Sequence, residues 1–443
     1  MEISKILLEK YKEKYNNSSN RVVANAIAKV GVREACFNND VIRKHNFVFS
    51  DVTKQGEITH QKASGRCWMF SALNVARINT MEKINVETFE FSQNYTLFID
   101  KLEKSNYFLE SILETLDEKI DSRIISHLLK DPVQDGGQWD MFKGLLKKYG
   151  AVPKYVMPET YHSSNTRYMS EIITTRLRKM ARDLRNKYNG SNIDELRKLK
   201  EEMLYDIYDI LVKCLGSLPE KFDFTYVDKD EKYHIDKDLT PVEFFEKYVG
   251  WNLEDKVSLI NAPTIDKPYN KVYTVKYLGT VKEESEMRYL NVPIEELKKA
   301  AIRSIKDGIP VWFGCDVGKL SSRDYGIMDY DAYSYDEVFS STKDFNKADR
   351  LDYGESLLTH AMVFTGVDLD ENGNPKTWKV ENSWGKDTCH DGMFSMSDKW
   401  FEEYNYQIMV DKKYISEEYL VYLDTDAVEL EPWDPFGALA MVK

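Results

Sequence analysis

Apolar residues occupy nearly the whole circumference of a helical pattern that runs from Cys67 to Met81, whereas Gln61 to Arg66 are polar and include Gly65. Ala, Leu and Met favour helix, and a helix that is apolar on all sides must be buried. The pattern therefore predicts a helix in a domain centre that begins at Cys67. First-turn amides and the positive end of the helix dipole favour a thiolate at that place. This stretch alone leaves an inert buried thiol as an equal alternative.

Hydrophobic periodicity predicts the other elements. Apolar positions three or four residues apart indicate helices, and alternating positions indicate half-buried strands. The chain is expected to form a first helix over residues 1–15, mixed strands and turns over 21–60, a strand over 272–277, a helix over 294–305 that ends at Gly308, and a strand over 309–317. That last strand contains Cys315, for which packing is the default role.

Residues 164–215 form a highly charged segment with a helical pattern. Helices that are polar on most faces usually serve subunit contacts. Within it, Arg176 to Lys187 holds six basic residues against one acid. A solvated or subunit-contact face is the simpler interpretation, and a nucleic-acid contact is the alternative. The net charge of -13 disfavours general affinity for nucleic acid.

Two later segments supply partners that could activate a thiol. His360 opens a short apolar strand that reaches Val367, and Trp378 and Val380 alternate with polar neighbours before Asn382. A histidine that takes the thiol proton, held by a third group, would make a nucleophile of the cysteine. If the two strands are neighbours, His360 and Asn382 lie side by side.

Other chemistry is not indicated. Asp368 to Gly373 copies the first half of an EF-hand loop, but its twelfth position is Lys379 rather than Glu, so we expect a hairpin turn. The cysteines at 36, 67, 214, 315 and 389 lack the spacing of a disulfide framework or zinc site. Nucleotide-binding and metalloprotease motifs are absent from the sequence. We expect neither a cofactor nor a metal.

These motifs together resemble the papain-type cysteine peptidases: Gln61 six positions before Cys67, the pair Cys67-Trp68, His360-Ala361 before an apolar strand, and Asn382-Ser383-Trp384-Gly385. Two features depart from the generic fingerprint. Ser64-Gly65-Arg66 precedes Cys67, and the spacing from Cys67 to His360 is about twice the usual one. Both departures and the tail from Pro432 to Ala440 resemble the corresponding features of the bleomycin hydrolase and bacterial aminopeptidase C family.

The resemblance implies a papain-like α+β fold with a helical left half and a β-barrel-like right half. Residues 1–443 would form a single catalytic unit, since no Pro/Gly/Ser-rich linker or repeat divides them. Residues 164–215 would be a helical insertion for oligomer contacts, and residues 424–443 a C-terminal arm that reaches the active-site cleft. Self-association, with a homohexamer as the expected assembly, is implied as well.

The resemblance also assigns roles to residues. Cys67 would be the nucleophile, His360 the acid and base, and Asn382 the group that orients the imidazole. The side chain of Gln61 and the backbone N–H of Cys67 would form the oxyanion hole. Residues of the cleft and substrate site would be Gly136, Gly137, Trp384 and Ala440.

The implied activity is that of a cysteine aminopeptidase that releases N-terminal residues from peptides and could hydrolyse amides such as that in bleomycin. In the family the chain commonly ends near the position of Ala440, and its carboxylate pairs with the substrate amine. This chain continues through Met441 to Lys443, which would cross Cys67 and inhibit the enzyme until trimmed. A thiol endopeptidase and an oligomeric nucleic-acid-binding protein are the alternatives.

The expected cellular compartment rests on the N-terminal residues and on the length of the apolar runs. The first ten residues carry acids and lack the apolar core of a signal peptide, and no apolar run approaches 18 residues. We expect a cytoplasmic protein that acts on peptides and has no membrane partner.

Overall fold

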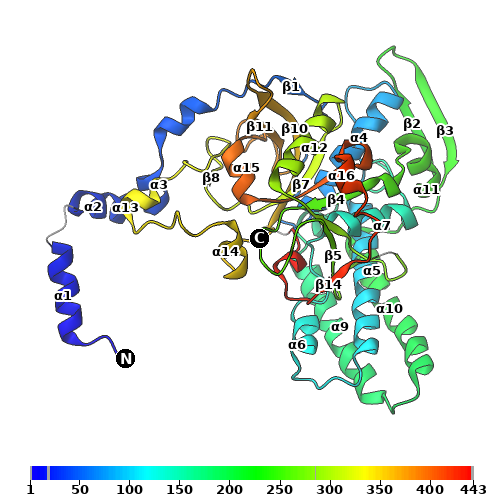
Figure 1. Cartoon of the computed structure of the whole chain (residues 1–443). Coiled ribbons are helices and arrows are strands. Elements are labelled where there is room, and N and C mark those ends of the chain that lie inside the picture. Colours follow the sequence, from blue (N-terminus) through cyan, green and yellow to red (C-terminus); the bar gives the residue numbers. More distant parts are fainter. Residues whose placement is uncertain (1, 17–19, 285, 441–443) are drawn as a thin grey trace.

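Helix α4 lies between a mixed β-sheet and a layer of helices (Figure 1). The computed structural model describes residues 2–16, 20–284 and 286–440. Its helices are α1 (Lys5–Asn16), α2 (Arg21–Val30), α3 (Val32–Cys36), α4 (Cys67–Lys83), α5 (Gln93–Glu114), α6 (Arg123–Lys130), α7 (Trp139–Tyr149), α8 (Tyr161–Ser164), α9 (Arg167–Lys187), α10 (Ile193–Leu215), α11 (Pro241–Phe244), α12 (Ile294–Lys306), α13 (Tyr335–Val338), α14 (Lys347–Asp352), α15 (Asp398–Tyr404) and α16 (Glu417–Leu420).

The main sheet runs in the order β14, β5, β6, β4, β13, β7, β10, β11, β12, β9, β8, and β1 pairs with β10. Its strands are β1 (Asp51–Val52), β4 (Lys256–Ile260), β5 (Lys271–Val275), β6 (Tyr289–Asn291), β7 (Val311–Cys315), β8 (Ser321–Ser322), β9 (Ile327–Met328), β10 (His360–Leu369), β11 (Pro375–Glu381), β12 (Met393–Ser397), β13 (Asn405–Asp411) and β14 (Val428–Leu430). A separate hairpin joins β2 (Phe222–Val227) to β3 (Tyr233–Leu239). The expectation of an α+β fold is confirmed.

The sheet separates two apolar cores, because successive strand residues point to opposite faces. Trp312 and Ala361 join the core around α4 and the other helices. Phe313, one residue further along β7, and Phe364, three residues further along β10, stack in the second core with α12. Helix α4 is buried without a break from Cys67 to Ile78, as its pattern predicts.

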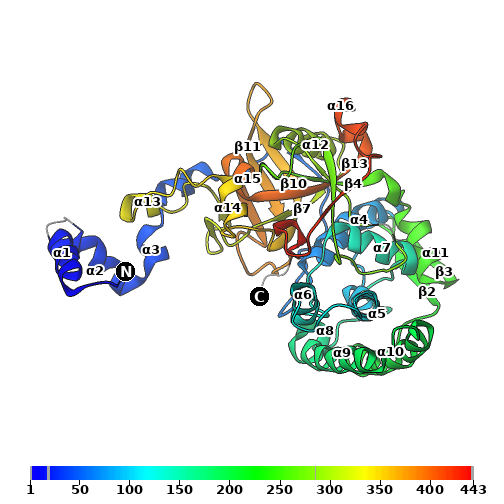
Figure 2. The ribbon, with the colours of Figure 1, turned by 60° about the horizontal axis from the view of Figure 1, so that its bottom comes forward.

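Helices α9 and α10 form a long pair that packs against α5, away from the sheet (Figures 1 and 2). The predicted helices of residues 164–215 are present, and each buries one stripe of its surface within the chain. Met169, Ile173 and Leu177 begin a buried stripe on α9 at helical spacing. Within the basic stretch, Arg178 and Arg185 donate to backbone carbonyls of the same chain.

Strands β10 and β11 form an antiparallel hairpin, with Val363 opposite Glu381. Asp370 closes its turn by accepting hydrogen bonds from the backbone of Asn372 and Asn374. This confirms the predicted turn. Because His360 begins β10 and Asn382 follows β11, the hairpin brings both to one end of the sheet.

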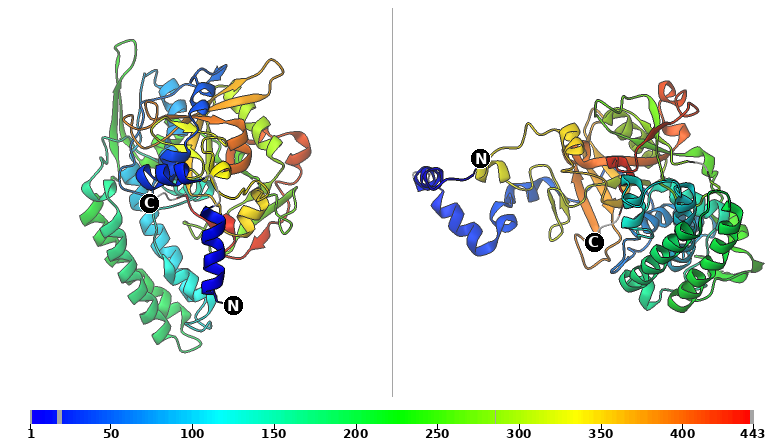
Figure 3. Two further views of the ribbon diagram at one scale, coloured as in Figure 1. Left: turned by 90° about the vertical axis from the view of Figure 1, so that its left-hand side faces the viewer. Right: turned by 90° about the horizontal axis from the view of Figure 1, so that it is seen from below.

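The N-terminal segment was predicted wrongly between residues 21 and 60. Helices α2 and α3 occupy much of it, and β1 is its short strand. The β-branched residues Val23, Ile27 and Val30 suggest strand by composition, yet they recur at helical spacing. The arm α1–α3 stands off from the body with α13 beside it (Figure 3), and neither α1 nor α2 buries a residue.

No described helix, in any of the three ranges of residues that the structure covers, is long and apolar enough to span a membrane.

Candidate active site

Cys67 is the first residue of α4 and is completely buried. The preceding residue, Arg66, makes a two-pronged ion pair with Glu159, at 2.9 and 2.8 Å between nitrogens and oxygens. The following residue, Trp68, donates from its indole nitrogen to the Asp135 carbonyl at 2.8 Å. The start of the helix is thereby fixed on both sides of the thiol.

His360 is held by Asn382. Its Nε2 lies 2.9 Å from the Asn382 side-chain oxygen, which also accepts from the backbone N–H of Ser383 at 2.8 Å. That oxygen can only accept, so Nε2 carries the proton and Nδ1 keeps its lone pair. Nδ1 is buried and has no hydrogen-bond partner among the described residues. This nitrogen is therefore the one available to take a proton from a thiol.

The imidazole is neutral in this environment. Burial lowers the pKa of His360 to about 4, the bond to Asn382 offsets part of that effect, and the charge of Arg323 lowers it further. Helix α4 is tied to the histidine strand, because the Ser71 hydroxyl donates to the Ala361 carbonyl at 2.9 Å. Cys67 and His360 thus lie at the junction of the same helix and strand.

Gln61 is fixed by the segment that follows Asn382. Its side-chain oxygen accepts from the Ser383 hydroxyl at 2.7 Å, and its backbone N–H donates to the Ser383 carbonyl at 2.8 Å. Its side-chain amide donates to the Ser64 carbonyl at 2.6 Å. An amide nitrogen has two N–H groups, so one remains for an oxyanion beside Cys67.

Trp384 covers the imidazole. The centres of its ring and the His360 ring are 4.9 Å apart. Arg323 lies on the same tryptophan, with its guanidinium carbon 4.1 Å from the ring centre. The aromatic ring thus separates the hydrogen bond between His360 and Asn382 from water.

Gly137 faces the C-terminal arm. Its carbonyl accepts from the backbone N–H of Ala440 at 3.2 Å, in an antiparallel bridge. A Cβ at this position would lie 2.4 Å from the buried Trp68 ring, so only glycine fits without movement. The carbonyl of Gly136 accepts from Lys104 at 2.6 Å instead.

The arm reaches Cys67. Lys267 binds Asp434 at 2.9 Å, and the side chain of Gln138 donates to the Ala438 carbonyl at 2.5 Å. The Cys67 thiol donates to the Ala440 carbonyl, with 3.3 Å between sulfur and oxygen. Ala440 is fully buried. The prediction for Met441 to Lys443 lies outside the described residues.

Sequence reasoning missed an ionic cluster behind the glycines. Asp135 pairs with Lys101 at 2.6 Å and accepts from the Gly65 backbone at 3.0 Å and from the Thr166 hydroxyl. Burial alone would raise the pKa of Asp135, but the Lys101 charge and these hydrogen bonds hold it well below its usual range. The cluster joins the loop before Cys67 to the glycine loop. Its only sequence signal was an acid adjoining the glycine pair.

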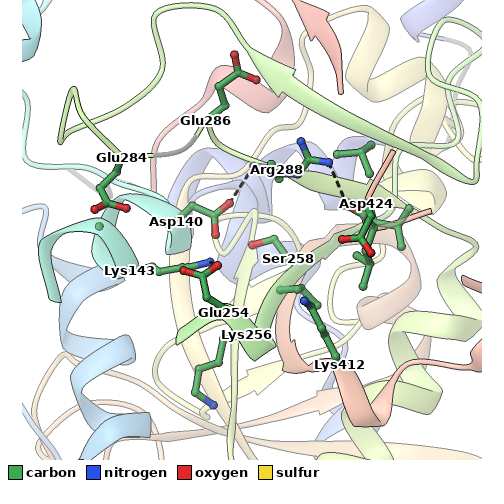
Figure 4. A pocket seen from close by; sticks show the side chains of 15 residues that line it. Asp140, Lys143, Glu254, Lys256, Ser258, Glu284, Glu286, Arg288, Lys412 and Asp424 are labelled. Carbon is green, nitrogen blue, oxygen red and sulfur yellow. Dashed lines mark hydrogen bonds and ion pairs between the residues drawn. The ribbon is translucent and has the colours of Figure 1, made fainter. Parts of the chain in front are cut away.

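A separate polar cavity lies away from the thiol (Figure 4). It lies beside α7 and β4 and holds charges of both signs, including Asp140, Lys143 and Arg288. Asp140 accepts from the Arg288 backbone N–H at 2.9 Å, and burial raises its pKa to about 6. Neither Cys67 nor His360 lines this cavity.

Within residues 2–16, 20–284 and 286–440, no group of three or more His, Cys, Asp or Glu side chains is placed to hold an ion.

Comparisons with known proteins bear on the family. A model of the Peptidase C1-like family matches residues 2–437. Aminopeptidase C of Listeria monocytogenes is 45% identical over 98% of both chains. Aminopeptidase C of Streptococcus thermophilus is 47% identical over 96% of this chain and 95% of its own. Human bleomycin hydrolase is 42% identical over 97% of this chain and 96% of its own.

A solved structure matches over the same length. The crystal structure of pepw from Lactobacillus rhamnosis superposes with a TM-score of 0.96, at 46% identity, and 99% of each chain is covered. A family model that spans nearly the whole chain, together with a matching fold, shows that this chain belongs to the Peptidase C1-like family.

Proposed function

We propose that the protein is a cysteine aminopeptidase that releases N-terminal residues from peptides. Relatives named Aminopeptidase C and bleomycin hydrolase cover nearly all of this chain. The geometry at Cys67, His360 and Asn382 suits a thiol mechanism. Hydrolysis of a bleomycin-type amide is a further activity of the same site.

Cys67 attacks the carbonyl carbon of the scissile amide after His360 Nδ1 has taken its proton. The thiolate then stabilises the imidazolium, which offsets the burial that lowers the pKa of His360. His360 protonates the leaving amine and later activates the water that releases the acyl group. Asn382 fixes the ring without a second negative charge.

Gln61 and the backbone N–H of Cys67 bind the tetrahedral oxyanion. The unused side-chain N–H of Gln61 supports this role, because the rest of its amide is already anchored. Loss of one such donor typically costs about 3 kcal/mol of transition-state stabilisation.

The C-terminal arm favours an aminopeptidase over an endopeptidase. Ala440 pairs with Gly137 and its carbonyl contacts the Cys67 thiol at 3.3 Å. An arm in that position fills the acyl side of the cleft, where a longer peptide would have to lie. This contact is the observation that carries the proposal.

The same contact supports self-inhibition by the tail. The Ala440 carbonyl contacts the Cys67 thiol, so a chain that continues beyond Ala440 would have to cross the thiol. We infer that the full chain resembles an enzyme with bound product and becomes competent when trimmed to near Ala440. Intact mass of the active enzyme, compared with Cys67→Ala, reads out trimming. An untrimmed wild type that equals a chain ending at Ala440 on free-amine peptides rules the inhibition out.

One peptide substrate tests the aminopeptidase assignment. A fluorogenic peptide with a free amine should be cleaved, and its N-acetylated form should not. Equal cleavage of the two forms would instead establish an endopeptidase.

The finer organisation of the chain is also a proposal. We assign a helical left half around α4 and α5, a β-barrel-like right half from the main sheet, an insertion at residues 164–215 and an arm at 424–443. The pairing of β14 with β5 supports an arm that begins near residue 424.

We further propose that the protein works in the cytoplasm as a homohexamer. Self-association is supported by the N-terminal arm, where Ile6 and Val22 are 68% and 79% exposed. Apolar faces of this kind, on helices that bury nothing, indicate a protein partner.

A further inference from the structure

Arg323 carries an exposed guanidinium at the edge of the active site. It begins the turn between β8 and β9, and its guanidinium carbon lies 4.1 Å from the centre of the Trp384 ring. The ring quadrupole attracts such a cation and holds it in place. Among the described residues, no carboxylate makes an ion pair with Arg323. A held, unpaired cation therefore faces solvent beside the imidazole.

The position of the C-terminal arm shows which part of a substrate reaches Arg323. Ala440 pairs with Gly137 in an antiparallel bridge, which the proposed function assigns to the acyl side of the cleft. The leaving amine must lie next to His360, because the imidazole protonates it. Trp384 is the ring neighbour of that imidazole, at 4.9 Å. The leaving group consequently passes over Trp384 towards Arg323.

We propose that Arg323 binds the terminal carboxylate of a one-residue leaving group, so that dipeptides with a free carboxylate are favoured substrates. This inference rests on the proposed peptidase function. One extended residue spans about 3.5 Å, and Trp384 has the imidazole at 4.9 Å and the guanidinium carbon at 4.1 Å from its ring. The planar guanidinium presents paired donors that fit a carboxylate.

The local charge supports the assignment. The chain has a net charge of -13, which repels a carboxylate substrate. Arg323 opposes that repulsion near the imidazole, and its field reaches His360. The neighbouring acid Asp324 acts on Cys389 with the opposite sign to Arg323. Arg323, rather than Asp324, is the charge that lies on the Trp384 ring.

The test compares one dipeptide with its C-terminal amide. The ratio of kcat/KM for the acid to that for the amide cancels any change in the chemical step. Arg323→Gln should lower this ratio about two- to fivefold, the size of an exposed ion pair. The loss should appear in KM with kcat unchanged, because the carboxylate is bound equally in the ground and transition states. Arg323→Lys should keep part of the preference.

Arg43→Gln is the matched control, because this substitution removes the same charge from a side chain that is 85% exposed and lies outside the site. It should leave the ratio unchanged. An Arg323→Gln ratio equal to wild type overturns the inference. An arylamide of a free amino acid, which has no carboxylate, separates the two proposals. If the arylamide is cleaved and Arg323→Gln leaves the acid-to-amide ratio unchanged, only the role of Arg323 is wrong. If neither the arylamide nor the dipeptide is cleaved, the peptidase function is wrong as well.

Discussion

At the scale of single residues, the site depends on which atoms are already occupied. The Asn382 side-chain oxygen accepts hydrogen bonds from His360 Nε2 and from the backbone N–H of Ser383, so only Nδ1 of the imidazole is left to face a thiol. Gln61 is likewise anchored through its oxygen and one N–H. The chemistry therefore falls to the atoms that the surrounding hydrogen bonds leave available.

Replacement of the nucleophile should separate catalysis from packing. Cys67→Ala is expected to lower kcat at least about a thousandfold, because no other thiol lies at the start of α4. Folding, followed by circular dichroism, should be unchanged. Cys315 is the control: it is fully buried, and burial raises its pKa far above that of an ordinary thiol. Cys315→Ala should retain activity and lower the free energy of unfolding by about 1 kcal/mol. Substantial turnover by Cys67→Ala would contradict the mechanism.

Asn382→Ala should lower kcat less than His360→Ala does. The first variant loses the orientation of the ring, whereas the second loses the proton acceptor itself. Steady-state rates across a pH series measure both. If the asparagine variant is as inactive as the histidine variant, the roles given to the two residues are wrong.

The buried imidazole should also make stability depend on pH. The pKa of His360 is about 4 in the fold and ordinarily 6.5, so between these values the unfolded chain binds more protons. The free energy of unfolding should therefore fall as pH drops from 6.5 to 4. The contribution of His360 is about 3 kcal/mol. Chemical denaturation of wild type and His360→Gln measures it, and parallel curves for the two would show that burial does not depress this pKa.

At the scale of elements, two segments meet in the cleft through backbone atoms. The glycine loop is held by Lys101, which donates to the Val133 carbonyl, and by Lys104, which donates to the Gly136 carbonyl. Asp135 ties the same loop to the backbone N–H of Gly65. Gly137 can then pair with Ala440 across the thiol. A rigid loop without a side chain lets another backbone approach closely.

Gly137→Ala should disturb both packing and activity. The new Cβ would lie 2.4 Å from the fully buried Trp68 ring, which cannot move aside easily. We expect a loss of about 1 to 3 kcal/mol in the free energy of unfolding and a lower kcat/KM. Gly318→Ala is the control, because the nearest atom to its Cβ is 3.9 Å away. Thermal unfolding compares the pair, and equal stability would show that the loop adapts.

At the scale of the whole molecule, the N-terminal arm and the body are built differently. The body has two apolar cores separated by the sheet. The arm α1–α3 extends away from it (Figure 3), and its first two helices bury no residue. A segment that buries so little within its own chain needs another surface to offset its conformational entropy.

Val22→Glu should weaken self-association while leaving the fold intact. Val22 is 79% exposed on α2, so a charge there disturbs nothing within the chain but opposes burial against a second copy. Sedimentation velocity should show smaller species than for wild type. Val421→Glu, at a site 69% exposed on the body, should leave the assembly unchanged. An unchanged assembly in Val22→Glu would exclude this face of α2 as the contact.

Local sequence pattern was sufficient to predict an element where the residue types within that segment decide its structure. Apolar positions around the full circumference predicted the buried helix α4, and Gly308 predicted the end of α12. The hairpin that joins His360 to Asn382 followed from alternation and a turn sequence. Composition gave the wrong prediction for residues 21–60. The valines of helix α2 are not buried within the chain, so burial does not select between a helical and a strand pattern there.

The sequence by itself determined the family, the candidate thiol, its histidine and asparagine, and the order of most elements, because these depend on local spacing and on motifs. Only the tertiary structure decided which imidazole nitrogen faces the thiol, because that depends on an acceptor 22 residues away. It also decided that Ala440 meets Cys67 across 373 positions, that Asp135 and Lys101 brace the glycine loop, and that Arg323 lies on Trp384. Such contacts join distant segments through packing and charge, and no local pattern in the chain records them.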